Sequence, residues 1–287
     1  MTAVALACTS AVLFGAMSVA VRFAVRESGD AELGSLAMSS VAFVLTAAIA
    51  VASTRHPDFG AVWPFLIAGT LAPGLSQVFF VRGVREAGAA RTSVLMGTAP
   101  LVAVAIALMF LDEPAEAPLL IGAGLIVAGG IALARERVRP ADFRRLGVVF
   151  ALTATVLFAV RDNVLRAIAK GTEVPALVAA PASLLAGLAT IALFLAIARP
   201  RHWARGYGRQ LRLFLPAGVL FALSYAALFE AYYRGGVTVV APLVATESLW
   251  GILFAALFLR RSELVGRWLV VGAVLIVAGG VLIGVSR

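Results

Sequence analysis

Chemistry in this chain must come from a few polar side chains that lie inside long apolar segments. Glu247 lies about ten residues into the apolar run 237–259, with Pro242 before it and Trp250 three residues after it. A carboxylate in lipid can bind a cationic group or a coupling proton, and the indole can form an aromatic wall beside it. The alternative is a structural carboxylate paired with an arginine of another helix. The sequence leaves both interpretations open.

A second polar cluster joins two helices of the second half of the chain. Asp162 and Arg166 are four residues apart, so they share a helix face and can pair. Arg161 points about 100° away from Asp162 around the helix, and we expect it to pair with Glu230. Glu230 and Arg234 are again four apart. The network is either a gate that opens as the charges exchange partners or a set of interfacial anchors whose long side chains reach toward water.

Two neutral polar residues are further candidates for contact with a substrate. Gln77 follows Pro73 and Gly74 in the third apolar run, and Tyr225 lies in the matching stretch of the eighth. Proline and glycine together predict a broken helix, whose free backbone groups and neighbouring amide could bind a substrate. A local kink packed against a neighbouring helix is equally compatible with the pattern. Arg22, at the end of the first run, is interpreted as an interfacial anchor.

The composition places these residues in a membrane. Hydrophobic residues make up 62% of the 287 residues and charged residues 14%, whereas soluble chains have about 45–50% and 25%. A soluble enzyme, a nucleic-acid-binding module and a disordered chain are therefore excluded. One cysteine and two histidines exclude an internal disulfide and leave almost no ligands for a metal. No cofactor, metal or nucleic-acid partner is expected, and a membrane-embedded enzyme is disfavoured for the same reason.

Ten runs have the length and apolarity of transmembrane helices, for which about 20 residues are needed. They are continuous, whereas barrel strands would alternate over about ten residues. The expected fold is therefore all-α, with short connections. The ten expected spans are 3–25, 33–52, 61–81, 92–111, 117–134, 146–168, 174–198, 213–233, 237–259 and 266–285.

The chain also repeats itself. The sequence LIVAGG at 125–130 recurs at 275–280, and TSAVLF at 9–14 resembles TATVLF at 153–158. Two halves, 1–140 and 141–287, would then hold five helices each. Because five is odd, the second half must enter the membrane from the opposite side, so the repeats are inverted. Inverted repeats are typical of secondary transporters, which bind substrate between the halves near the midplane.

The ordered set of motifs resembles the EamA-type transporters of the drug/metabolite transporter superfamily. The similar segments are AVLFGAMSVAVR at 11–22, GTAPLVAV at 97–104, and the acidic turns before the glycine-rich helices, FLDEP at 110–114 and FLRRSE at 258–263. The resemblance covers essentially the whole chain. It implies a multi-pass protein of the plasma (inner) membrane that exports small polar or amphipathic metabolites, such as amino acids, by alternating access. One departure is Trp250, which the repeat alignment places opposite Pro100.

Charge predicts the orientation of the chain. We name the face on which the first span begins side A and the opposite face side B. Only six of the 24 Lys and Arg residues belong to side A, and the other 18 belong to side B. Cationic loops are retained in the cytoplasm, which predicts a cytoplasmic side B and both termini outside.

The driving force and the oligomeric state stay open at this stage. The chain has no GxxxxGK[ST] motif, so proton coupling through Glu247 is the leading hypothesis, and an uncoupled facilitator or channel is the alternative. The glycines at 280 and 284 form a GxxxG pattern. This pattern suits either packing within the chain or a homodimer contact.

Overall fold

The computed structural model describes residues 2–53, 60–102, 105, 117–136, 142–169, 171–198, 205–235, 237–259 and 264–285, and every regular element within them is helical. The side chain of Arg166 lies outside this description, and with it the predicted Asp162–Arg166 pair. The acidic turn at 110–114 lies outside it as well, and of the turn at 258–263 only residues 258 and 259 are described. Eight helices in the described part are long and apolar enough to cross a membrane, and the last helix is a shorter apolar one. With the fourth span, of which the first turns are described, the predicted ten-helix membrane fold is confirmed.

The elements of the first half build five spans. The third span consists of three consecutive pieces, because its helix changes to a π-helical turn, η2, around Pro73. The bounds are α1 (Ala3–Ser28), α2 (Ala31–Ser53), η1 (Gly60–Val62), α3 (Trp63–Gly69), η2 (Thr70–Leu75), α4 (Ser76–Ala87), α5 (Ala89–Met96) and α7 (Ala117–Ala134).

The second half repeats this pattern, with its fourth span divided into two helices. The bounds are α8 (Arg145–Ala169), α9 (Ala176–Ala198), α10 (Tyr207–Arg234), α11 (Val237–Ala245), α12 (Glu247–Phe258) and α13 (Arg267–Val285). Two helices extend furthest beyond their predicted ends: α4 continues to Ala87 rather than 81, and α10 begins at Tyr207 rather than 213. Arginines near these ends close the apolar run, but they do not interrupt helical hydrogen bonding.

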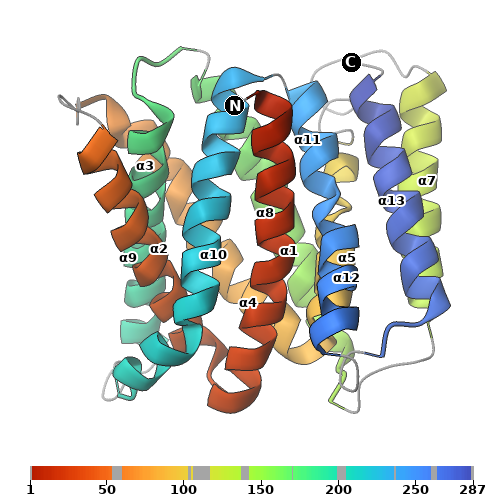
Figure 1. Ribbon diagram of the computed structural model, residues 1–287, viewed down its shortest axis with the longest axis horizontal. Helices are drawn as coiled ribbons and strands as arrows, with labels where there is room; N and C mark the ends of the chain where they lie inside the picture. Colours follow the sequence, from red (N-terminus) through yellow and green to blue (C-terminus); the bar gives the residue numbers. More distant parts are fainter. Residues whose placement is uncertain are drawn as a thin grey trace.

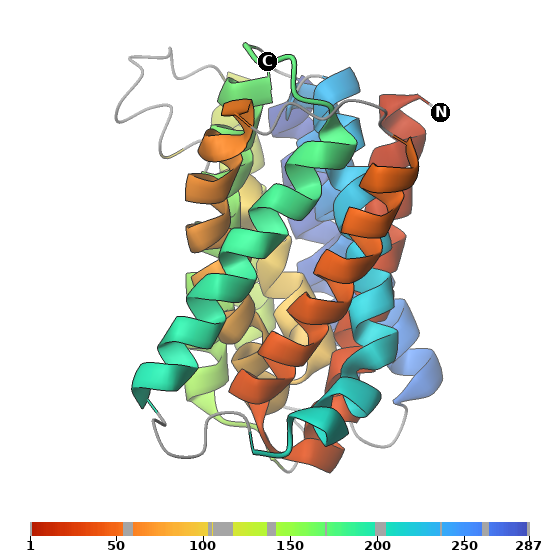
Figure 2. The same ribbon diagram turned by 90° about the vertical axis from the view of Figure 1, so that its left-hand side faces the viewer.

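The two halves cross the membrane in opposite directions. Both termini lie at one end of the molecule, side A, and α1 runs from there to side B (Figure 1). After five spans the chain is at side B, where α8 begins. A view from the flank shows α2 and α9 crossing side by side in front of the other helices (Figure 2), and the two helices pack together.

Glycines bring the last helices of the two halves, α7 and α13, into close contact. A Cβ atom on Gly129 would lie 2.7 Å from the carbonyl oxygen of Gly272, and a Cβ atom on Gly279 would lie 2.5 Å from that of Gly122. Only glycine permits such an approach of two helix backbones. With an offset of 150 residues, Gly122 corresponds to Gly272 and Gly129 to Gly279. The symmetry that relates the two repeats therefore converts one contact into the other.

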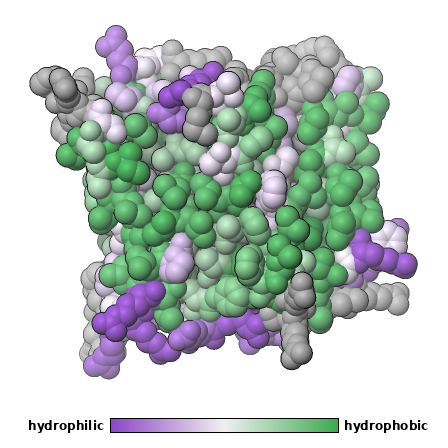
Figure 3. All heavy atoms as spheres, viewed as in Figure 1, coloured by the Kyte–Doolittle hydropathy of each residue, from purple (hydrophilic) through white to green (hydrophobic). Residues whose placement is uncertain are grey.

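The surface has the distribution that a bilayer requires. Apolar side chains cover the middle of the face seen in Figure 3, and hydrophilic residues gather along its lower edge, side B. Helices α1, α2, α9, α10 and α13 all present exposed large apolar side chains on this outer surface. Of the GxxxG pair, Gly280 faces Pro100 and Ala245 of the same chain, so it gives no support to a homodimer contact.

Candidate functional site

A cavity of ≈ 70 Å³ lies where the two halves meet. Its walls come from α1 and the fourth span of the first half, and from α8, α10, α11 and α12 of the second. Ser10 lies within the first three turns of α1 and Tyr232 in the last turn of α10, so the cavity is nearer to side A. The polar side chains in its wall are Ser10, Arg161, Asp162, Asn163, Tyr232 and Glu247.

The fourth span of each half is broken where it reaches the cavity. Helix α5 ends at Met96, and helical structure resumes after the turn at Gly97 and Thr98. Helix α11 ends at Ala245, and α12 begins after Thr246. Both threonine hydroxyls donate to the carbonyl three residues earlier, Thr98 to Leu95 and Thr246 to Leu243. Transporters use such discontinuous helices to present helix ends and backbone groups to a substrate.

The positions of these breaks correct one detail of the repeat alignment. The breaks at Thr98 and Thr246 are 148 residues apart, whereas the glycine motifs are 150 apart. Pro100 therefore corresponds to Ser248, not to Trp250. Insertions of one or two residues in a loop change the offset between elements, which a single alignment of motifs cannot show.

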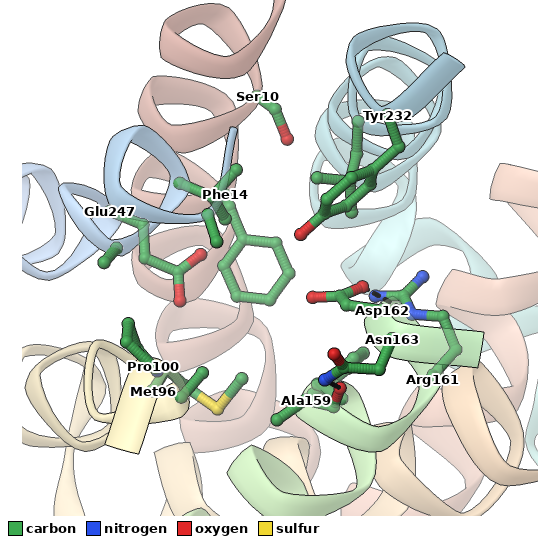
Figure 4. Close-up of a pocket in the computed structure, with 16 residues that line it drawn as sticks. Ser10, Phe14, Met96, Pro100, Ala159, Arg161, Asp162, Asn163, Tyr232 and Glu247 are labelled. Atoms are coloured by element: carbon green, nitrogen blue, oxygen red, sulfur yellow. Dashed lines mark hydrogen bonds and ion pairs between the residues drawn. The ribbon is translucent and has the colours of Figure 1, made fainter. Parts of the chain in front are cut away.

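Glu247 is the first residue of α12 and is 5% exposed. Its carboxylate points into the cavity from the side opposite Asp162 (Figure 4). Among the described residues it forms no hydrogen bond or ion pair. The amino end of α12 favours a negative charge through the helix dipole. A buried carboxylate without a partner is nevertheless costly, and a proton or a cationic ligand would remove that cost.

Arg161 and Asp162 form the opposite wall. Arg161 Nε lies 2.9 Å from Asp162 Oδ1, and Arg161 is 3% exposed. The guanidinium also lies over two aromatic rings, 5.0 Å from the centroid of Tyr225 and 5.4 Å from that of Phe158. These ring faces attract the cation. Arg161 is thus held by one carboxylate and two rings.

The predicted pair of Arg161 with Glu230 is wrong. Arg161 pairs with its sequence neighbour Asp162, and Glu230 Oε2 lies 2.7 Å from Nη2 of Arg234, four residues on. The long arginine side chain spans the angle between neighbouring helix positions, because both groups bend toward the same cavity. The predicted Glu230–Arg234 pair is therefore formed, on a half-exposed surface near the end of α10.

Tyr232 is a cavity residue that sequence reasoning missed. Its hydroxyl points toward the space between the two carboxylates of Glu247 and Asp162 (Figure 4). A tyrosine near the end of a membrane helix is usually an interfacial residue, which hid this role. The signal that could have found it is its spacing of seven from the candidate Tyr225, which places both tyrosines on one face of α10.

Tyr225 lies beside the cavity rather than in its wall. Its ring supports Arg161, and its hydroxyl forms a hydrogen bond of 2.9 Å with Ser183 Oγ and a longer contact of 3.5 Å with the carbonyl of Ala72. Ala72 has φ −144° and ψ 118°, so the third span is broken directly before Pro73, as predicted. Tyr225 therefore connects the Arg161 wall to the break in the third span.

Gln77 and Trp250 do not line the cavity. Gln77 is fully buried in α4, and neither side-chain polar atom has a hydrogen-bond partner among the described residues. Trp250 packs against α1 at Gly15 and stacks on Phe254 with ring centroids 6.0 Å apart. Glu247 and Trp250 are nearly one helical turn apart, but only the carboxylate reaches the cavity.

Aromatic rings lie on the side B end of the cavity. Phe14 contacts Phe80 and Phe158, with ring centroids 5.3 and 6.2 Å apart. Phe14 and Phe158 also line the cavity, whereas Phe80 is fully buried below it. This cluster joins α1 and α4 of the first half to α8 of the second.

Ionic contacts close the molecule at side B. Arg22 is 1% exposed, and its Nη2 donates to both carboxylate oxygens of Asp142, at 2.9 and 2.8 Å. Its Nη1 donates to the carbonyls of Val84 and Arg85, at 3.2 and 2.7 Å. The interpretation of Arg22 as an interfacial anchor is therefore wrong, because three backbone segments bury its guanidinium. Asp142 leads into the second half, so the contact joins the two repeats.

Comparisons with known proteins agree with this architecture. A solved crystal structure, 20% identical in sequence, matches with a TM-score of 0.65 and covers 98% of this chain and 95% of its own. At this identity the match shows the shared fold alone. A search of the curated proteins gives no match. The model of the EamA-like transporter family matches residues 1–135 and again 145–285, two domains that together span nearly the whole chain.

The matched domains are those of a transporter rather than an enzyme family. With its ten membrane-crossing helices and its duplicated domain, this chain belongs to the EamA-like transporter family.

Proposed function

We propose that the chain is a secondary transporter that carries a small polar or amphipathic metabolite, such as an amino acid, through the cavity between its halves. Three features support this site. Both halves contribute to it, both fourth spans are broken beside it, and it contains buried charged groups. Alternating access then consists of one half moving against the other about the site.

The distribution of contacts indicates which state the structure represents. The cavity lies toward side A, while the Phe14 cluster and the Arg22 contacts close side B. Its volume of ≈ 70 Å³ is below the roughly 300–1,000 Å³ of small-molecule sites. The cavity must therefore widen toward side A before a metabolite enters, and the side B contacts must break before it leaves.

The observation that carries the proposal is the buried carboxylate of Glu247, unpaired among the described residues and facing Asp162 across the cavity. The wall holds two carboxylates and one guanidinium, which gives a formal charge of −1 when all three are ionised. A proton on Glu247, or a cationic group of the substrate, would neutralise this excess. We infer that the two compete for Glu247, which couples transport to the proton gradient.

Transport by reconstituted protein tests this assignment. Purified protein in proteoliposomes is assayed with and without a pH gradient, as wild type, Glu247→Gln and Glu230→Gln. Glu230 is the matched control, because its carboxylate already pairs with Arg234 outside the cavity. We expect a pH gradient to stimulate wild type and Glu230→Gln, but not Glu247→Gln.

Two outcomes would overturn parts of the proposal. Normal gradient-driven transport by Glu247→Gln would remove Glu247 from the coupling step. Saturable transport by wild type at a rate independent of the pH gradient would identify an uncoupled facilitator. A conductance that does not saturate would identify a channel.

The direction and the membrane are also part of the proposal. The excess of arginine at side B supports a cytoplasmic side B in the plasma (inner) membrane. Export of the metabolite follows from the family resemblance, since no residue of the cavity distinguishes the two directions.

A further inference from the structure

A second hollow lies on the flank of the molecule, apart from the cavity. It has a volume of ≈ 470 Å³ and is lined by residues of α5, α7 and α8 and by the connections that join them. Val127, Val149 and Leu152 are 49%, 55% and 42% exposed, so the hollow opens toward the surrounding lipid. We call it the flank groove.

The apolar part of the flank groove spans about two thirds of the hydrocarbon depth of one leaflet. Along α8 it extends from Arg145, at side B, to Leu152. Seven residues of helix rise about 10 Å, which is most of the roughly 15 Å hydrocarbon depth of a leaflet. Val127, Leu133 and Val149 are among the apolar side chains in the walls.

Charged side chains gather only at the side B end of this groove among its described lining residues. Arg91 is 3% exposed, with its guanidinium 5.7 Å from the ring centroid of Phe143, and Arg145 is exposed at the start of α8. Glu136 is the acidic residue nearby, and its Oε2 accepts a hydrogen bond from the amide of Leu269, at 3.3 Å. The end of the groove thus has two cationic groups against one carboxylate.

We propose that the flank groove binds an anionic phospholipid. One acyl chain lies between α7 and α8, and the phosphate lies against Arg91 and Arg145 at the headgroup level of side B. Arginine pairs well with phosphate oxygens, and basic pockets between membrane helices favour anionic headgroups. This inference is independent of the transport proposal.

The flank groove and the cavity lie on two sides of the fourth span of the first half. Leu95, Thr98 and Leu101 line the flank groove, whereas Met96 and Pro100 of the same segment line the cavity. The broken fourth span is therefore a shared wall with the lipid on one side and the cavity on the other.

Native mass spectrometry of the purified protein, released from detergent with added lipid, tests the proposal. Wild type is offered equal amounts of phosphatidylglycerol and phosphatidylcholine with matched acyl chains. We expect preferential retention of phosphatidylglycerol. Arg145→Gln should weaken that retention about fivefold, the effect of one basic residue near an anionic headgroup. Arg212→Gln is the matched control, since Arg212 is an exposed side B arginine outside the groove.

A second pair of variants tests the acyl part. Val149→Trp fills the apolar groove, and Val156→Trp places the same ring on an exposed position of α8 outside it. Only Val149→Trp should release both lipids. Inorganic phosphate should fail to displace phosphatidylglycerol, because it lacks the acyl chain.

Three results would overturn the inference. The first is equal retention of the two lipids by wild type, and the second is equal effects of Arg145→Gln and Arg212→Gln. The third is full displacement by phosphate together with normal binding by Val149→Trp, which would show a free-anion site instead of a lipid site.

Discussion

Among the described residues, the buried charges of Arg22 and Arg161 are surrounded by groups that offset them, whereas that of Glu247 is not. Arg22 has a carboxylate and two carbonyls, and Arg161 has a carboxylate and two aromatic rings. Glu247 has the amino end of α12 but no paired group in the described structure. This difference supports our proposal that the charge of Glu247 changes during a transport cycle.

The Arg161–Asp162 pair gives a test at the level of single residues. Asp162→Asn leaves the buried guanidinium without its counter-charge, which typically costs about 3–5 kcal/mol. Glu230→Gln removes a carboxylate from a half-exposed pair, which costs about 0–1 kcal/mol. Thermal unfolding of the purified variants in detergent should show a large loss of Tm for Asp162→Asn alone. Similar melting temperatures for the two variants would show that Asp162 does not hold Arg161.

A second substitution separates stability from transport at the same pair. Arg161→Gln combined with Asp162→Asn removes both charges, so it should recover much of the stability that Asp162→Asn loses. Transport should stay impaired, because the wall then lacks its charge pair. If the double variant does not recover stability, the guanidinium stabilises the protein mainly through its contacts with the aromatic rings and not through its pair with Asp162.

The residue types that matter could be predicted from the sequence, but their partners could not. Glu247, Arg161 and Asp162 stand out as charges in apolar runs, and the structure places all three around one cavity. The partner of Arg161 depends on which helices pack together, so the Glu230 prediction failed. Tyr232 was missed because an aromatic residue near a helix end has an ordinary interfacial explanation.

At the scale of elements, the third span and both fourth spans are interrupted by breaks. The third span breaks at Ala72 and Pro73, and the fourth spans break at Thr98 and Thr246. The Pro73–Gly74 pair predicted the first break, whereas the breaks of the fourth spans lie two residues before Pro100 and four residues after Pro242. There the hydroxyl and the backbone amide of each threonine both donate to the carbonyl three residues earlier.

The α7–α13 contact provides a test at this scale. In Gly129→Ala the new methyl group would lie 2.7 Å from the carbonyl oxygen of Gly272, whereas in Gly130→Ala it has nothing within 4 Å. Overpacking of this kind costs about 1–3 kcal/mol, and alanine at an open helix position is neutral or favourable. Thermal unfolding should therefore give a lower Tm for Gly129→Ala than for Gly130→Ala. Equal Tm values would place the close contact of the two helices elsewhere.

At the scale of the whole molecule, apolarity and an odd number of spans per repeat determine the architecture. Hydrophobic run length identified the spans, because the bilayer fixes how much apolar helix is needed. The spans could not show how the helices cluster around a cavity, since run length carries no information about neighbours. The reciprocal glycine contacts of α7 and α13 now add a physical sign of the inverted symmetry.

The orientation of the molecule is testable with fusions to the chain terminus. Eighteen of the 24 basic residues belong to side B, so we expect side B in the cytoplasm and the carboxyl terminus outside. In a bacterial host, a carboxyl-terminal alkaline phosphatase fusion should be active and a fluorescent protein fusion dark. The opposite pattern would reverse the orientation, and with it the side toward which the present cavity faces.

The central claim is that one cavity between inverted halves is exposed to each side of the membrane in turn. A single cysteine in place of Ser10, in a Cys8→Ser background, reports on that cavity. A membrane-impermeant maleimide should label it from side A in the wild-type framework, while Arg22→Gln, which removes the side B contact with Asp142, should add labelling from side B. Equal labelling from both sides without the Arg22 substitution, or from neither side with it, would contradict alternating access through this site.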